Sequence, residues 1–150
     1  MRFRSPRSGG QRWAQRGNAI LIGSLFAAVA GGASAVDVKV TVQPQGTPPP
    51  SGWKCGGGNA SYEICVDQEP ITPPGANGTP VAIEWNLRDA PGWSFDGSNG
   101  IVIELPWQVR CNPNGSTCNA RHHKDGKRYK YTINLTNGTT PIPWDPTIQN

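Results

Sequence analysis

Residues 36–42, VDVKVTV, alternate strictly between valine and polar side chains. Successive side chains of an extended strand point to opposite faces, so this pattern predicts a strand with one buried face and one solvated face. Residues 81–87, VAIEWNL, repeat the alternation, with Val81, Ile83 and Trp85 on the inward side. Such half-buried strands need a second apolar layer to cover them.

Other segments extend the same pattern. Residues 62–66 (YEICV) and residues 128–135 (RYKYTINL) have apolar or aromatic side chains in phase on one face. Residues 101–105 (IVIEL) form a nearly continuous apolar run, which predicts a central strand. We expect residues 107–111 to continue that strand past a bulge at Pro106.

Turn residues separate these strands. The segments KDGK (124–127) and NG (137–138) are typical of β-hairpins, and GGGNA (56–60) indicates a flexible turn. No window of eleven residues after residue 35 has helical spacing. The sequence therefore predicts an all-β fold, an antiparallel Ig-like β-sandwich of about seven strands in one domain, residues 36–150. Long proline-rich connections, such as residues 43–53, favour a sandwich over a closed barrel.

The first 35 residues have the composition of an export signal. They contain five arginines and no acidic residue, a twelve-residue apolar run from Ala19 to Ala30, and the triplet Ala33-Ser34-Ala35. Twelve helical residues span about 18 Å, less than the roughly 30 Å of a bilayer core. The segment predicts a signal peptide cleaved after Ala35, with no membrane anchor left and a periplasmic or secreted product. An uncleaved anchor is the alternative.

The charge of the chain depends on this leader. The whole chain has 14 Lys and Arg against 10 Asp and Glu, but residues 36–150 have nine basic and ten acidic residues. Nucleic-acid binding needs clustered basic side chains that release counterions from phosphate. The basic excess belongs to the leader, so the composition does not predict a nucleic-acid partner.

Four cysteines, an even number, suit an oxidising compartment. Of the three possible pairings we expect Cys55–Cys65 and Cys111–Cys118, because each pair brackets a Gly- and Asn-rich stretch that can turn the chain. The spacings are wider than those usual for zinc. His122 and His123 follow Cys118, but adjacent strand residues point to opposite faces and a cationic cluster surrounds both. They are interpreted as solvated loop residues, and no metal or cofactor is predicted.

A family resemblance rests on several motifs in residues 81–150. These are PGWSF (91–95), GIVI (100–103), the paired cysteines, KYTIN (130–134) and WDP (144–146). With them the chain resembles a family of small, uncharacterised exported bacterial proteins. The resemblance implies export and a β fold, and it brings no functional residues.

Two groups of residues are candidates for binding. Five tryptophans follow residue 35, and exposed rings can stack on sugars. The candidate rings for a glycan are Trp93, Trp107 and Trp144. The alternative is that they fill a core short of aliphatic side chains. The basic run of residues 121–130 is the second candidate surface for a partner, or else a solvated hairpin tip; its members of interest are Arg121, Lys124, Lys127 and Arg128.

No catalytic motif is present. The sequence has no Gly-x-Ser-x-Gly, and nothing in it places Glu84 and Glu104 together as a glycosidase pair would require. We therefore expect a non-enzymatic exported protein that presents loops or edge strands to a protein or glycan. The alternative is a carbohydrate-binding module that uses exposed tryptophans.

Overall fold

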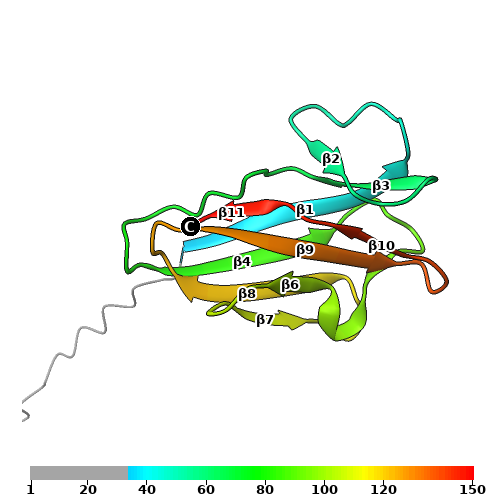
Figure 1. Ribbon diagram of the computed structural model, residues 1–150. Helices are drawn as coiled ribbons and strands as arrows, with labels where there is room; N and C mark the ends of the chain where they lie inside the picture. Colours follow the sequence, from blue (N-terminus) through cyan, green and yellow to red (C-terminus); the bar gives the residue numbers. More distant parts are fainter. Residues whose placement is uncertain (1–33) are drawn as a thin grey trace, which may run out of the picture. The chain divides into compact units, whose positions relative to one another are not determined.

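The computed structural model describes residues 34–150, and nearly all of the expected signal peptide lies outside this range. The described chain is all β, with one 3-10 turn, η1 (Gly97–Asn99), and no α-helix (Figure 1). The strands, in chain order, are β1 (Ser34–Pro44), β2 (Lys54–Gly56), β3 (Tyr62–Val66), β4 (Pro80–Leu87), β5 (Ser94–Phe95), β6 (Ile101–Ile103), β7 (Gln108–Cys111), β8 (Thr117–His123), β9 (Arg128–Thr136), β10 (Pro141–Trp144) and β11 (Thr147–Gln149).

The first sheet has six strands in the order β2-β3-β1-β4-β8-β7. The long alternating strand β1 lies inside it, antiparallel to β3 and parallel to β4, with Val38 opposite Trp85. The expectation of a purely antiparallel fold is wrong at this pair. The connection of residues 67–79 carries the chain back to the end at which β1 starts, so β4 must run in the same direction as β1.

The second sheet is built around β9. β10 and β11 pair with one side of β9, and β5 and β6 pair with its other side. The long strand is thus flanked on each side by two short strands placed end to end. The Asn137-Gly138 turn joins β9 to its neighbour β10, which confirms the predicted hairpin.

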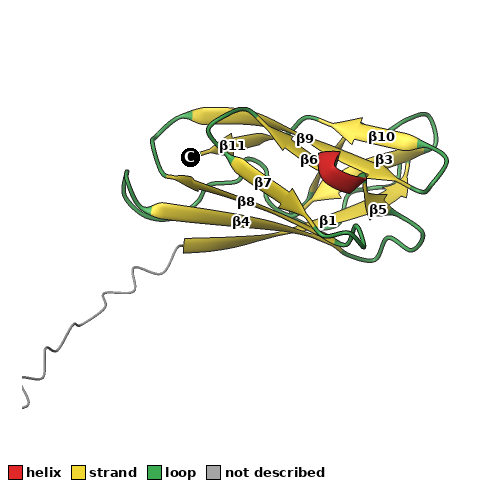
Figure 2. Ribbon diagram, turned by 90° about the horizontal axis from the view of Figure 1, so that it is seen from below, coloured by secondary structure: helices red, strands yellow, loops and turns green. Residues whose placement is uncertain are grey.

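The two sheets pack face to face around one apolar core (Figure 2). Alternation decides which side chains enter it: β9 buries Tyr129, Tyr131, Ile133 and Leu135, as its pattern predicts. The chain therefore forms a two-layered β-sandwich with two separate sheets. The largest fully buried side chains are Trp85, Tyr131, Phe95, Ile64, Ile71, Ile83, Ile101, Ile133, Leu135, Ile142, Ile148 and Val38.

Three local expectations are wrong because sheet membership is not a local property. The KDGK turn joins β8 of the first sheet to β9 of the second, so it does not close a hairpin. The IVIEL segment forms β6, which among the described strands pairs only with β9 and is an edge strand. The segment after Pro106 becomes β7 of the other sheet, where it pairs with β8.

Both expected disulfides are present. Cys55–Cys65 joins β2 to β3, and Cys111–Cys118 joins β7 to β8, in each case between residues directly opposite one another. β2 and β7 are the two outermost strands of the first sheet, with three and four residues. Each short edge strand is therefore tied covalently to the one neighbour that it has among strands of residues 34–150.

One side of the sandwich is closed by the chain itself. The Gly58 amide donates to the Pro143 carbonyl (2.8 Å), which links the β2–β3 loop to β10. Ile71 forms a bridge with Ile148 of β11. A side chain on Gly57 would come within 2.2 Å of the Pro143 carbonyl oxygen, and its φ is +59°. The glycine run is thus a close contact with the second sheet, not the flexible turn expected from its composition.

Candidate binding surface

On the opposite side of the sandwich, β6 and β7 lie next to each other without pairing, and a side chain on Gly100, directly before β6, would lie 3.1–3.2 Å from the sulfurs of the Cys111–Cys118 disulfide. Within residues 34–150, no backbone hydrogen bond joins β6 to β7, although the Phe95 amide and the Gly115 carbonyl are bonded nearby (2.7 Å). We call the region formed by β6, β7 and the residues between them the open side. Figure 1 shows these two strands as neighbours at the same side of the molecule. Unpaired strand edges of this kind can accept another strand.

The register shows which backbone groups of β6 face outward. The Asn134 amide donates to the Gly100 carbonyl (2.8 Å), and Val102 lies opposite Thr132 two residues further on. Backbone direction alternates in an antiparallel pair, so the N–H and C=O groups of Val102 point toward β9. Those of Ile101 and Ile103 point away from β9, at the free edge.

The open side also has the most exposed large hydrophobic side chains of the described chain. Leu105 is 88% exposed and Val102 is 48% exposed, whereas the next in order, Tyr62, is 37% exposed. Leu105 lies in the crossover between β6 and β7, and Glu104 beside it is also exposed. Exposed apolar side chains at an unpaired strand edge are typical of interaction sites.

The tryptophans are mainly structural. Trp107 is only 4% exposed and packs against His122, so as a stacking surface for a glycan this candidate is wrong. Trp144 is half-buried with its indole against the backbone of Gly56. Trp93 is also half-buried and packs edge-on against Tyr62, with 5.3 Å between ring centroids. Of the three candidates, Trp93 lies beside the most accessible aromatic partner.

The basic candidates do not form one patch. Arg121 is exposed on the outer face of the first sheet, while Arg128 lies on the second sheet and donates to Gln149 (3.3 Å). The Lys124 ammonium donates to the Pro73 carbonyl, and Lys127 is exposed in the turn. Because the turn spans the two sheets instead of closing a hairpin, it separates these charges.

The two histidines lie on β8, not in a solvated loop. His123 is exposed, whereas the His122 side chain is 15% exposed and lies between Trp107 and the β8–β9 turn. They occupy opposite faces of the strand, as expected for adjacent residues. Within the described range, no three His, Cys, Asp or Glu side chains are close enough together to hold a metal ion.

Asp125 organises the turn between the sheets. Its carboxylate accepts hydrogen bonds from the Tyr129 hydroxyl, the Lys127 amide (3.0 Å) and the Asn150 side-chain amide (3.0 Å), and lies 3.5 Å from the His122 imidazole. Partial burial raises the pKa of Asp125, but these hydrogen bonds outweigh it and hold the pKa well below its usual range. The hydrogen bond from the Tyr129 hydroxyl to Asp125, together with desolvation and the negative charge of Asp125, raises the pKa of Tyr129 to about 12.

A pH dependence of stability follows. Because the pKa of Asp125 is lower in the folded state, its contribution is present above about pH 4 and is lost as the pH falls below that value. Asp125→Asn is expected to cost about 1–3 kcal/mol at neutral pH, through loss of charge-assisted hydrogen bonds. It should also flatten the acid limb of unfolding free energy against pH in urea titrations. An acid limb identical to that of the parent protein would contradict this role.

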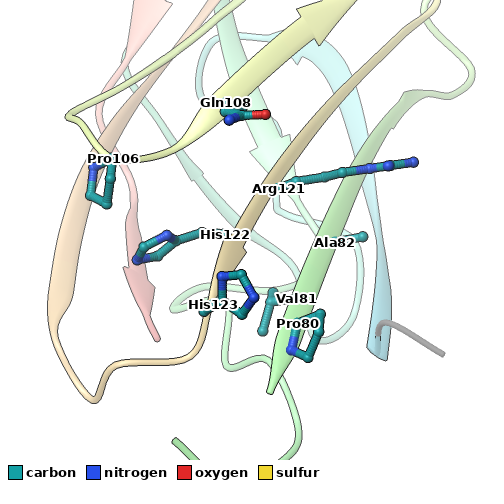
Figure 3. A pocket seen from close by; sticks show the side chains of 8 residues that line it. All are labelled: Pro80, Val81, Ala82, Pro106, Gln108, Arg121, His122 and His123. Atoms are coloured by element: carbon teal, nitrogen blue, oxygen red, sulfur yellow. The ribbon is translucent and has the colours of Figure 1, made fainter. Parts of the chain in front are cut away.

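A pocket of about 600 Å³ lies where β8 extends past the first residue of β7, Gln108 (Figure 3). In this view the Arg121 side chain extends across β4 near Ala82, whereas His122 lies on the other side of β8 and points toward Pro106. The lining of the pocket thus combines apolar residues with nitrogen-bearing side chains. Its lining residues are Pro80, Val81, Ala82, Pro106, Gln108, Arg121, His122 and His123.

Several residues of the open side and of the pocket belong to no motif that would predict a binding role from the sequence. Leu105 and Val102 belong to a run that indicates a central strand, and Gln108 and Pro80 have no motif around them. The available signal is Pro106, because proline cannot donate to a ladder and is confined to strand edges and bulges. It indicates the place where the chain leaves one sheet for the other.

The two glutamates considered for catalysis lie on different sheets. Glu84 faces outward from β4 of the first sheet and accepts a hydrogen bond from Asn86 (2.8 Å). Glu104 follows β6 of the second sheet and is exposed.

In the part of the chain that the structure covers, no helix has both the length and the apolar character needed to cross a bilayer.

No protein-family model and no curated protein sequence matches this chain. The resemblance to small exported bacterial proteins therefore stays a prediction from its motifs.

Proposed function

We propose that this protein is a non-enzymatic exported binding protein whose open side takes up an extended segment of a partner protein. The observation that carries this proposal is the combination of an edge strand that has no outer neighbour within the described chain and the strongly exposed Leu105 beside it. Strand addition uses main-chain hydrogen bonds for affinity and side-chain contacts for specificity. The outward backbone groups of Ile101 and Ile103 supply the first, and Val102 and Leu105 supply the second.

The difference between the closed side and the open side of the sandwich supports the open side as the binding site. Bonds of Gly58 and Ile71 with the second sheet occupy the closed side. Natural edge strands are usually protected by charges, prolines or covering loops. β6 has a lysine at none of its positions and exposes valine instead. A protein that keeps such an edge accessible is suited to accept a strand from elsewhere.

Export belongs to the same proposal. Two disulfides between opposed strand residues suit an oxidising compartment, which the predicted signal peptide would reach. β1 begins at Ser34, so cleavage after Ala35 would remove the first two residues of this strand. The Ig-like assignment within the sandwich class is also part of the proposal, supported by two packed sheets and long connections.

The proposal is tested by measuring the binding of this protein to an array of extended apolar heptapeptides. We expect bound peptides to slow amide hydrogen exchange at Ile103, whose N–H faces the free edge, more than at Val102, whose N–H already faces β9. Leu105→Asp should reduce binding at least about tenfold, since it places a charge in the apolar contact. The control is Thr140→Asp, an equal charge change in the exposed β9–β10 loop, which should leave binding unchanged.

Two results would contradict the proposal. One is an array without binders. The other is binding that Leu105→Asp leaves intact. The second candidate function, glycan binding, is favoured by the Tyr62–Trp93 ring pair. Binding to a glycan array that Trp93→Ala abolishes, together with no peptide binding, would replace the first proposal by the second.

A further inference from the structure

The outer face of the first sheet presents polar side chains over four adjacent strands, β1, β4, β8 and β7. The valines of β1 and the alternate residues of β4 and β8 point into the core, so the polar residues between them lie on this outer face. The register aligns them in rows that cross the four strands. We call one of these rows the central row. From β1 to β7 its members are Asp37, Glu84, Asn119 and Arg110.

One end of the central row is acidic. Asp37 and Glu84 are direct neighbours on parallel strands, and the side-chain amide of Asn86 donates to both carboxylates, at 2.8 Å each. Among residues 34–150 neither carboxylate has a basic side chain within 4.0 Å. Like charges on directly opposed strand residues are destabilising. A basic group placed over this end of the row would relieve the repulsion between the two carboxylates.

The other end of the central row is basic. In the described part of the chain Arg110 has no carboxylate within 4.0 Å. It borders a hollow of about 280 Å³, none of whose lining residues is acidic. The lining residues are Gln108, Arg110, Asn119 and Arg121. Each of these side chains bears N–H donors, so the hollow suits an incoming carboxylate.

Short side chains lie between the two ends. Ala82 and Asn86 of β4 are half-buried, as are Thr117 and Asn119 of β8. Arg121 extends across β4 near Ala82 (Figure 3). Sheets that pack face to face approach to about 10 Å. A middle built mostly of short side chains lets a second sheet approach this face.

The central row is complementary to its own reverse. A two-fold axis parallel to the strands, between β4 and β8, places a second copy over this face with the strand order reversed. Arg110 of one copy then faces Asp37 of the other, and Asn119 faces Glu84. A two-fold axis across the strands would instead place Asp37 over Asp37, so the charges select the first arrangement. A surface that meets itself in this way forms an isologous dimer, in which each contact occurs twice.

We propose that the outer face of the first sheet binds a second copy of this chain in this two-fold arrangement. The Asp37 carboxylate of each copy enters the hollow beside Arg110 of the other. Complementary charges set the orientation of the two copies. The dimer uses side chains on the outer face of the first sheet, whereas the proposed uptake of a partner segment uses the edge of β6 in the second sheet. The two proposals are therefore independent.

Sedimentation velocity of the exported, processed protein tests the dimer. We expect a dissociation constant of about 10–100 µM at low salt, as for a small polar interface. Asp37→Arg and Arg110→Asp should each weaken self-association at least about tenfold, because each places like charges together at both contacts. Both residues are exposed on strands, so both variants are expected to fold, and circular dichroism checks this. If either unfolds, Asp37→Asn and Arg110→Gln replace the pair, with an expected loss of about threefold each.

An equimolar mixture of Asp37→Arg and Arg110→Asp is the sharpest measurement. In the mixed dimer the introduced arginine faces the introduced aspartate, and the second contact keeps the original Asp37 and Arg110. Association should therefore return to within about threefold of that of the parent protein. The control is Lys130→Asp, a charge reversal on an exposed residue of β9 in the second sheet, which should leave the dimer unchanged.

Three results would overturn this proposal. The first is a parent protein that stays monomeric at and above this concentration range. The second is a dimer that both charge reversals leave intact, and the third is a mixture that associates no better than either variant alone. Leu105→Asp, which tests the uptake of a partner segment, should not change the dimer. Self-association that is lost in Leu105→Asp and kept in Asp37→Arg would place the contact at β6 instead.

Discussion

Reduction of both disulfides is expected to lower the free energy of unfolding by about 5–6 kcal/mol, since closure of each short loop contributes about 2.5–3 kcal/mol. The two sequence separations are 10 and 7 residues. Single domains of this size are stable by only about 5–15 kcal/mol. We therefore expect the reduced protein to be largely unfolded near body temperature. Thermal unfolding with and without reductant, followed by circular dichroism, measures this loss.

The position of the disulfides in the sheet is a second reason, besides loop entropy, to expect a loss of stability on reduction. Both disulfides hold outermost strands of the first sheet, which have three or four residues and, in the part of the chain that the structure describes, a single neighbour. The double variants Cys55→Ala/Cys65→Ala and Cys111→Ala/Cys118→Ala should each show part of the loss. A variant without any of the four cysteines is the control, because reductant should not change its melting curve. A parent protein whose melting curve is insensitive to reductant would contradict the role given to the disulfides.

Trp85→Ala is expected to cost about 3–5 kcal/mol, the range for removing a large aromatic side chain from a packed core. Trp85 is fully buried on β4, between Val38 of β1 and Cys118 of β8 in the register of the first sheet. Its ring lies 5.4 Å from that of Tyr131, on β9 of the second sheet. The indole therefore joins the two layers at the middle of the core.

Urea unfolding of Trp85→Ala beside Trp93→Ala separates burial from residue type. Trp93 is half-buried, so its removal takes less apolar area out of the core and should cost less than about 2 kcal/mol. Trp85→Phe, which keeps an aromatic ring in place, should lose less than Trp85→Ala. Equal losses for Trp85→Ala and Trp93→Ala would show that the core is not centred on Trp85.

Local features of the fold could be predicted from the sequence with good accuracy. The alternation of β1, β3, β4 and β9 identifies the inward faces, because the two-residue period is a property of each strand alone. The disulfide pairing is also local, since each pair is close in the chain. The binding residues could not be predicted in this way. The sequence suggests Trp107 as a stacking ring, but it is buried, and it suggests Leu105 as a core residue, but it is the most exposed large hydrophobic side chain among those described.

What the sequence by itself determined is the extended character of the chain, the identity of its inward faces, the short crosslinks and the Asn137-Gly138 hairpin. Only the tertiary structure decided which sheet each strand joins, that β1 and β4 run parallel, and that β6 has a free edge. The physical reason is that apolar burial has no direction: it requires a buried face but does not specify which neighbour covers it. That choice depends on all strands at once, and it also creates the pocket where β8 extends past the start of β7.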